Sequence, residues 1–533
     1  MFSYSEEQLK SLARVEETRP ERTGKDLRRL TADEKDALLA AFHPDYIRSA
    51  YTNLQVGANA GAPVLKELAA LLQGTPRILS EKVDLSKVKY DVDVLIIGGG
   101  AGASAAIEAK RAGANVMMVT KLRIGDANTA MAEGGIQAAD REGDSPAIHY
   151  LDALGGGHFK NKQELLEKLV TEAPEAILWL NTLGVMFDKD KNGDMVETHG
   201  GGTSRKRMHA CRDYSGSEIM RVLRDEVLNL GIPVVDFTSA IELIKDTDGK
   251  AAGAVLQNME TGEIMIARAK TVVLATGGAG RLHYQGFPTS NHYGATADGL
   301  ILAYRAGAKL LYPETLQYHP TGVAAPTQIY GALVTEKVRS LGAQLVGKDG
   351  TAFVNPLETR DVTASSIIRE CKERKNGLQT TDGEGVWLDT PMIDLIHGEG
   401  TIEKRIPAML RMFGKYGLDI RKQPILVYPT LHYQNGGVDI SANAESGVKN
   451  LFVAGEAAGG IHGTNRLMGN SLLDIIVFGR TAGKNAAARA KETKTKKLTL
   501  AFVDEFVAAM QKAGCESEEV SPRLLPDYRR KDM

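Results

Sequence analysis

Side chains that bind carboxylates recur beside glycine and proline in the second half of the chain. They are His319, Thr335, Glu336, Arg339, His432 and Arg466. Histidine and arginine offer N–H donors that can hold a carboxylate in one orientation, and arginine stays charged at physiological pH. Two histidines and two or more arginines are what a ligand with two carboxylates requires. The sequence therefore predicts a dicarboxylate pocket.

The elements that must position this pocket begin with an apolar run at 93–97. It ends in Gly98-Gly99-Gly100-Ala101-Gly102, after which an alanine-rich segment reaches about residue 112 and a second apolar run covers 116–119. A strand, a glycine-rich turn, a helix and a second strand in this order predict a βαβ dinucleotide-binding unit. A packed strand and helix joined by a glycine turn is the alternative for this segment taken alone.

Individual residues of the turn have separate roles in such a unit. Gly98 permits the tight turn, and Gly100 lets the backbone approach a pyrophosphate, which the free N–H groups of the helix start can bind. Two features depart from the usual pattern. Ala103 replaces the third glycine, and Thr120-Lys121 stands where an acidic residue usually ends the second strand.

Further segments follow in an order that is characteristic of one family. They are Asn128-Thr129, 132–135, 275–281, 297–299, 318–322, Thr335-Glu336, 359–361, 431–433, 453–456 and 465–472. On these segments the chain resembles the flavoprotein subunit of fumarate reductase and succinate dehydrogenase from roughly residue 90 to 482. Many spaced segments in one order are far more specific than a lone glycine motif. The family also tolerates a hydroxyl residue and lysine at the end of the second strand.

The resemblance implies an α/β fold: a Rossmann-like FAD-binding domain with an inserted α+β capping domain, here preceded by a helical N-terminal extension. We expect the following division: 1–89, the extension; 90–316, the first part of the FAD-binding domain; 317–425, the capping domain; 426–483, the second part of the FAD-binding domain; 484–533, a C-terminal tail. Expected helices cover 163–183, 217–230, 364–375 and 402–416, and a β-meander covers 241–269.

The resemblance also implies FAD as cofactor. The residues that would bind it are Gly98, Gly100, Ala101, Gly102, Ala103, Thr120, Lys121, Asn128, Thr129, Glu133, Gly134, Gly135, Ala275, Thr276, Gly277, Gly278, Asp298, Glu456, Asn470, Ser471 and Leu472. Membrane-bound members carry a histidine bonded to the flavin where this chain has Asn128. We therefore expect FAD that is not covalently linked.

By resemblance, His319, Thr335, His432 and Arg466 would hold the carboxylates of fumarate, and Arg360 would donate a proton to the substrate carbon. Hydride would come from flavin N5, and Glu336 and Arg339 would pass protons to Arg360. The family usually reads Arg-Gly-Glu-Gly where this chain has Arg-Ser-Leu-Gly at 339–342. Because of that difference, the sequence does not identify the residue at the outer end of the proton relay.

The same residues have ordinary structural interpretations. His319 could be a loop histidine bonded to backbone, Arg360 could form a surface ion pair, and Glu336 with Arg339 could be a pair on the surface of a helix. For the basic segment 205–212, a solvated charged turn is the preferred interpretation.

Composition excludes several classes of partner. The 533 residues carry a net charge of −2, with 43% hydrophobic and 25% charged residues, which is typical of a soluble globular protein with more than one domain. Nothing indicates binding of nucleic acid. No stretch reaches the ~18 apolar residues of a transmembrane segment, and the polar start lacks the apolar core of a signal peptide. We expect a cytoplasmic protein that partner subunits could attach to a membrane.

The three cysteines, Cys211, Cys371 and Cys515, are widely separated. They cannot supply the four thiolates of an iron–sulfur cluster, and no spacing of metal ligands is present. An iron–sulfur electron-transfer subunit is therefore the expected redox partner. It could dock on the extension and the tail, although the extension could equally pack on its own flavin domain.

The favoured function is reduction of fumarate to succinate, or their interconversion. An L-aspartate oxidase-like flavoenzyme is the nearest alternative, since similar residues would bind its substrate. A second alternative is a subunit that only passes electrons and acts on no dicarboxylate. Such a subunit would not need the predicted carboxylate-binding histidines and arginines.

Overall fold

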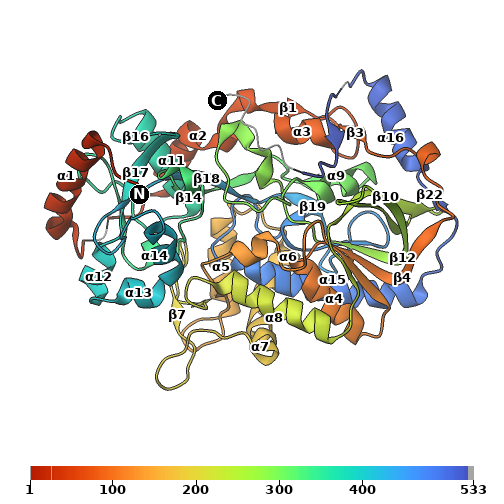
Figure 1. Cartoon of the computed structure of the whole chain (residues 1–533), viewed down its shortest axis with the longest axis horizontal. Helices are drawn as coiled ribbons and strands as arrows, with labels where there is room; N and C mark the ends of the chain where they lie inside the picture. Colours follow the sequence, from red (N-terminus) through yellow and green to blue (C-terminus); the bar gives the residue numbers. More distant parts are fainter. Residues whose placement is uncertain (1, 26, 516, 526–533) are drawn as a thin grey trace.

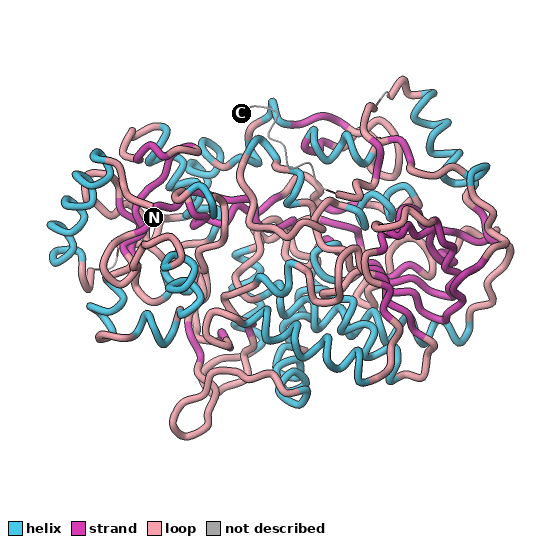
Figure 2. The backbone as a smooth tube through the Cα atoms, viewed as in Figure 1, coloured by secondary structure: helices cyan, strands magenta, loops and turns pink. Residues whose placement is uncertain are grey.

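The computed structural model describes residues 2–25, 27–515 and 517–525. Its two largest sheets have eight and five strands, four further sheets of two or three strands occur in the described residues, and helices pack around them (Figure 2). The large sheet has the order β22-β10-β11-β12-β4-β5-β9, and β20 also pairs with β12. Its strands are β4 (Val88–Ile97), β5 (Val116–Val119), β9 (Val234–Val235), β10 (Thr238–Asp246), β11 (Ala251–Asn258), β12 (Ile264–Leu274), β20 (Leu451–Val453) and β22 (Leu498–Thr499).

The centre of this sheet is parallel and buried. β12 pairs in parallel with β4 and β20, and β4 pairs in parallel with β5. Val94–Ile97 and all of β5 are buried, as expected for strands covered on both faces. β10, β11 and β12 form an antiparallel meander, as predicted.

Two helices cover the parallel strands at close range. They are α4 (Ala101–Arg111), which follows the glycine turn, and α15 (Asn470–Glu492). A Cβ at Gly483 would lie 2.1 Å from the carbonyl oxygen of Ala105, so glycine is what lets the two helices approach. The predicted strand-helix-strand unit is thus confirmed, and the segment that begins at Asn470 supplies a second helix packed against α4.

The five-stranded sheet, on the left in Figure 1, is built mainly from the segment expected as the capping domain, 317–425, together with residues 426–434 beyond that expected boundary. Its order is β14-β18-β17-β15, with β16 paired to β17. The strands are β14 (Leu316–Val323), β15 (Gln344–Val346), β16 (Leu378–Thr380), β17 (Gly383–Asp389) and β18 (Ile425–Gln434), and the helices are α10 (Lys337–Ser340), α11 (Arg360–Lys372), α12 (Met392–His397), α13 (Thr401–Arg405) and α14 (Pro407–Gly414). β14 carries His319 and β18 carries His432.

Two helices expected as single elements are each split by a proline. The segment 163–183 forms α6 (Gln163–Thr171) and α7 (Ala173–Leu183), with Pro174 in the first turn of α7. The segment 402–416 divides into α13 and α14, and Pro407 opens the second. Proline lacks the N–H and favours a helix start, which explains both breaks. Helix α8 (Ser215–Asn229) matches the other amphipathic prediction, and α5 (Pro146–Gly156) was not predicted.

The extension packs on its own chain. Helix α1 (Glu6–Arg22) lies on the capping domain, where Trp387 Nε1 donates to Ser11 Oγ at 2.9 Å. Helix α3 (Lys66–Leu72) buries Leu68, Leu71 and Leu72 in the core of the flavin domain. Helix α2 (Ala32–Phe42) lies against α11. Of the two expected roles, the structure shows intramolecular packing, on both domains.

The C-terminal tail also folds back on the flavin domain. Helix α16 (Ala501–Lys512) is followed by β23 (Val520–Ser521), which pairs in parallel with β3 (Thr75–Pro76) of the extension. Within the described residues, no helix combines the length and apolar character needed to cross a bilayer.

Candidate active site

One cavity opens beyond the carboxyl ends of β4 and β12, where ligands bind in open α/β sheets. Gly98, at φ +113°, closes the turn after β4, and a Cβ there would lie 2.1 Å from the carbonyl oxygen of Ala275. A Cβ at Gly100 would lie 2.5 Å from Thr129 Oγ1. Position 98 thus requires glycine because backbone approaches backbone, whereas at Gly100 the close neighbour is a side-chain hydroxyl.

Two helices begin at this cavity without a side-chain cap. Gly100 precedes α4 and Gly469 precedes α15, and neither can offer a side-chain acceptor to the first N–H groups. Free N–H groups and the positive end of the helix dipole suit phosphate. The residues present therefore fit the pyrophosphate of a dinucleotide such as FAD.

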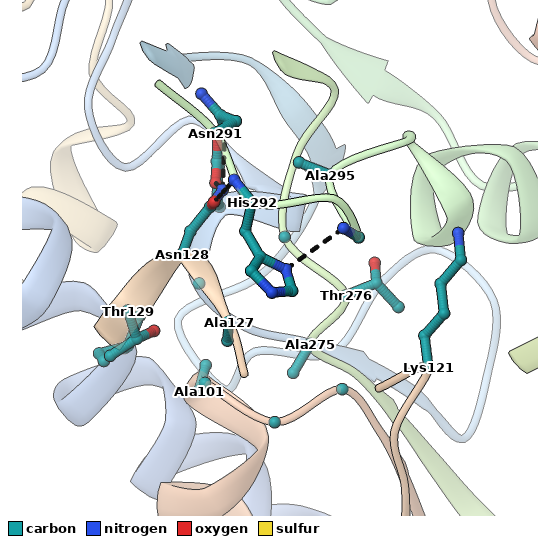
Figure 3. Close-up of a pocket in the computed structure, with 18 of the residues that line it drawn as sticks. Ala101, Lys121, Ala127, Asn128, Thr129, Ala275, Thr276, Asn291, His292 and Ala295 are labelled. Carbon is teal, nitrogen blue, oxygen red and sulfur yellow. Dashed lines mark hydrogen bonds between the residues drawn. The ribbon is translucent and has the colours of Figure 1, made fainter. Parts of the chain in front are cut away.

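Polar side chains hold the cavity wall in place (Figure 3). Asn128 Nδ2 donates to Asn291 Oδ1 at 2.7 Å, and Asn128 Oδ1 accepts from the backbone N–H of His292. Lys121 Nζ lies 2.9 Å from Asp298 Oδ2. These bonds fix side chains that line the cavity from three separate segments of the chain.

Most of the predicted FAD-binding residues line this cavity. They are Gly98, Gly100, Ala101, Thr120, Lys121, Asn128, Thr129, Ala275, Thr276, Gly277, Asp298, Glu456, Ser471 and Leu472. The others lie behind its wall and are Gly102, Ala103, Glu133, Gly134, Gly135, Gly278 and Asn470. Gly102 packs against Ile96, and the Asn470 side chain bonds to His149, so both support the wall from outside.

The same cavity also reaches the predicted dicarboxylate residues, because His432 and Arg466 line it. The rings of His319 and His432 lie edge to face with centroids 5.1 Å apart. Ser290 Oγ lies 2.8 Å from His432 Nδ1. The guanidinium of Arg466 lies over the ring of Tyr433 at 4.3 Å. The structure thus places His432 and Arg466 on the cavity that the glycine turn also lines, with His319 packed against His432 and outside the cavity lining.

Arg360 lies in a buried ionic cluster. Its Nε donates to Glu336 Oε2 at 2.7 Å, and Arg339 Nη2 lies 3.3 Å from the same oxygen. The backbone N–H of Gly201 donates to Glu336 Oε1 at 2.6 Å. Arg360, Glu336 and Arg339 are 6%, 1% and 1% exposed. The order Arg339, Glu336, Arg360 is therefore a continuous chain of charge-assisted contacts.

Thr335 lies beside the strand of His319. The backbone N–H of Val334 donates to the carbonyl of Thr321 at 2.9 Å, and Thr335 is buried. His319 Nδ1 accepts from the backbone N–H of Thr321 at 3.2 Å. A neutral His319 ring then carries its proton on Nε2, which has no partner among the described residues. That N–H is free to donate to a ligand.

Burial and positive charge set the protonation of the site. Burial, together with Arg360, holds the pKa of His319 and His432 well below the ordinary value, so both rings are neutral near pH 7. Burial alone would raise the pKa of Glu336, but Arg360 and Arg339 hold it below the ordinary value, so it stays ionised. Burial and Arg360 lower the pKa of Arg466 to about 9. The chamber therefore favours an anion.

The ordinary interpretations do not hold for the ionic cluster. Arg360 is buried and bonded to Glu336, not on the surface, and Glu336 with Arg339 is a buried pair. The solvated-turn interpretation is wrong for Arg207 and His209, which are buried. Arg207 pairs with two aspartates, Asp144 and Asp152, because a buried guanidinium requires anionic partners.

Sequence reasoning missed Gln317, which joins Arg360 and Arg466. Its Oε1 accepts from Arg360 Nη1 at 2.9 Å, and its Nε2 donates to the carbonyl of Arg466 at 2.6 Å. Gln317 lies two residues before His319 on one strand, and residues spaced by two share a face. That spacing was the signal available in the sequence.

Comparison with known proteins agrees with this geometry. Residues 93–472 match the family described as FAD binding domain. One chain of the fumarate reductase (CoM/CoB) of Methanothermobacter marburgensis is 38% identical, over 76% of this chain and 74% of its own. An L-aspartate oxidase of Streptomyces coelicolor is 36% identical, over 75% of this chain and 69% of its own.

The solved structures extend the likeness to the fold. A quinol fumarate reductase flavoprotein of E. coli superposes with a TM-score of 0.72 at 31% identity, covering 79% of this chain and 74% of its own. The α/β fold predicted from the sequence is confirmed. The chain thus belongs to the FAD-binding oxidoreductase family of fumarate reductase and succinate dehydrogenase flavoprotein subunits.

Proposed function

We propose that this chain reduces fumarate to succinate, or interconverts them, as the flavoprotein subunit of an electron-transfer complex. One observation carries the proposal: a single cavity is lined by the glycine turn at one part and by His432 and Arg466 at another. Arg360 reaches the same cluster through Gln317. When bound there, FAD would supply a hydride through flavin N5.

The cationic cluster would orient the substrate. Arg466 and the N–H groups of His319 and His432 would bind the two carboxylates, with Thr335 adding a hydroxyl donor. Charge-assisted bonds to carboxylates also stabilise the negative charge that develops as hydride arrives. Exclusion of water from a buried chamber strengthens this effect.

Arg360 would donate the proton. An arginine is a weak acid, but the acceptor is a carbanion-like carbon of high basicity, so donor and acceptor are comparable. Glu336, hydrogen-bonded to Arg360 and ion-paired with Arg339, would return a proton to Arg360. Arg339 Nη1 donates to the carbonyl of Pro356, so the outer end of the proposed relay would lie near residue 356.

Electrons would reach FAD from an iron–sulfur subunit. Cys211 and Cys371 are buried and lie far apart in the sequence, and Cys515 is partly buried. A cluster of the usual four-thiolate kind thus needs cysteines from another chain.

The test is flavin spectroscopy of the purified protein. Anaerobically reduced flavin should be reoxidised by fumarate, whereas L-aspartate should leave oxidised flavin unchanged. Reduction of the flavin by L-aspartate without any response to fumarate would favour an oxidase, as in the Streptomyces relative. If the flavin responded to neither compound, the dicarboxylate assignment would be refuted. The remaining alternative would then be a subunit that only relays electrons.

A further inference from the structure

The start of helix α11 carries Arg360 beside Asp361, whose negative charge suits the helix dipole. Thr359 precedes it without forming a side-chain cap. A cation at the N-terminus of a helix opposes the helix dipole, and the first N–H groups of a helix have no intrahelical partner. Arg360 therefore needs contacts from outside α11 to keep its position.

The N-terminal extension supplies those contacts through Glu358, two residues before Arg360. The backbone N–H of Leu30 donates to Glu358 Oε1 at 2.8 Å, and Lys35 Nζ lies 2.9 Å from Glu358 Oε2. Glu358 is 1% exposed. Asn355 Nδ2 donates to the carbonyl of Leu27. Both oxygens of a buried carboxylate are thus bonded to the extension.

Apolar packing adds to these polar bonds. Leu38 and Leu39 of α2 form a buried cluster with Val362 of α11, and Leu30 and Phe42 pack against it. Val362 lies two residues after Arg360. The extension therefore contacts α11 on both sides of the proposed proton donor.

The other end of the same segment is fixed to the strand of His319. Asp45 Oδ2 accepts from the backbone N–H of Leu316 at 3.0 Å, at the start of β14. The ring of His43 lies edge to face with Tyr318, with centroids 5.7 Å apart. Figure 1 shows α2 beside α11. The segment therefore bridges two elements that carry substrate groups.

We infer that residues 27–46 form a positioning strap, which holds Arg360 at a fixed distance from Gln317 and His319. The segment lies before the family match, which begins at residue 93. This inference rests on the proposed function for its catalytic consequence. The structural part of the inference, that the strap supports α11, does not depend on the proposed function.

Lys35→Ala tests the strap, because the Lys35 side chain is 29% exposed and its loss leaves the core intact. The kcat for fumarate should fall roughly ten-fold, since small displacements of a catalytic group are costly. The KM and the flavin content should change little, because Arg466 and the glycine turn are untouched. Glu358→Gln should have a similar effect, and the double variant should be no worse than either single variant.

Hydrogen exchange gives a readout that does not depend on turnover. Amides of α11 from Thr363 onward should exchange faster in Lys35→Ala and in Leu38→Ala, while β10–β12 exchange as in the wild type. Lys10→Ala is the matched control, because Lys10 forms an exposed pair with Glu6 in α1. It should change neither kcat nor exchange.

The outcomes separate the two proposals. A wild type that does not reduce fumarate refutes the proposed function, while exchange in α11 still reports on the strap. Unchanged exchange in both variants would overturn the inference. So would an unchanged kcat in the Lys35→Ala form of a wild type that does reduce fumarate.

Discussion

At the scale of single residues, the site combines fixed cations with unused donors. Arg466 is 3% exposed and its Nε has no partner among the described residues. Its guanidinium lies over the ring of Tyr433, which attracts a cation but does not neutralise it. A buried charge without an ionic partner is costly. A bound carboxylate would pair with the charge and lower the free-energy cost of burying it. This explains how an arginine at this position could serve to bind substrate.

The two arginines should respond differently to substitution. Arg360→Lys should abolish fumarate turnover with FAD still bound, because lysine lacks the planar group that reaches Glu336 and Gln317 together. Arg466→Ala should instead weaken substrate binding, by roughly 1.5–3 kcal/mol for one charged hydrogen-bonding partner.

Steady-state kinetics with reduced dye would measure both effects. Arg374→Lys is the control and should behave as wild type, because the half-exposed Arg374 side chain pairs with Glu370 at the far end of α11. Normal fumarate kinetics in the Arg360→Lys variant would show that Arg360 is not the proton donor.

At the scale of elements, the local pattern of apolar residues and glycines was enough to predict the first strand and helix of the flavin domain. The apolar run at 93–97 and its glycine turn predicted β4 and α4 because both follow from local sequence. The amphipathic pattern continues across Pro174 and Pro407. Each of these regions was therefore predicted as one helix, although the structure divides it at the proline. The burial of Arg207 depends on Asp144 and Asp152, whose proximity only the tertiary fold reveals.

The glycine turn gives a prediction with a matched control. Gly98→Ala should yield protein with little flavin and lower thermal stability, because its Cβ would overlap the carbonyl of Ala275. Gly113→Ala shares the strain of positive φ, at +85° against +113°, but meets no atom within 4 Å. It should keep its flavin and lose only about 1 kcal/mol.

Flavin-to-protein ratio and melting temperature report both changes. If Gly98→Ala bound flavin as well as Gly113→Ala, the turn would not be the site of close cofactor approach.

At the scale of the whole molecule, the proposed catalytic cluster is assembled from distant parts of the chain. Arg360 comes from α11, Gln317 from β14 and Arg466 from the loop before α15. The strap of residues 27–46 joins the first two. Family motifs predicted most of the individual residues, but the strap lies outside them. Its role could not be predicted because α2 has no motif of its own.

Cofactor attachment is a property that follows from one position. Asn128 lines the FAD cavity, and an amide cannot form the bond that a histidine forms with the flavin ring. Acid precipitation should therefore release all flavin into the supernatant. Yellow colour that stays with the denatured polypeptide would contradict this expectation.

The direction of catalysis should follow from the same position. In relatives with a covalent link, that bond raises the flavin potential and supports succinate oxidation. Without it the flavin is more reducing, so hydride donation to fumarate should be faster than hydride removal from succinate. Initial rates with a reduced viologen and fumarate, and with an oxidised dye and succinate, would measure the two directions on one preparation. The slower rate should be that with succinate, and equal rates would show that Asn128 does not set the direction.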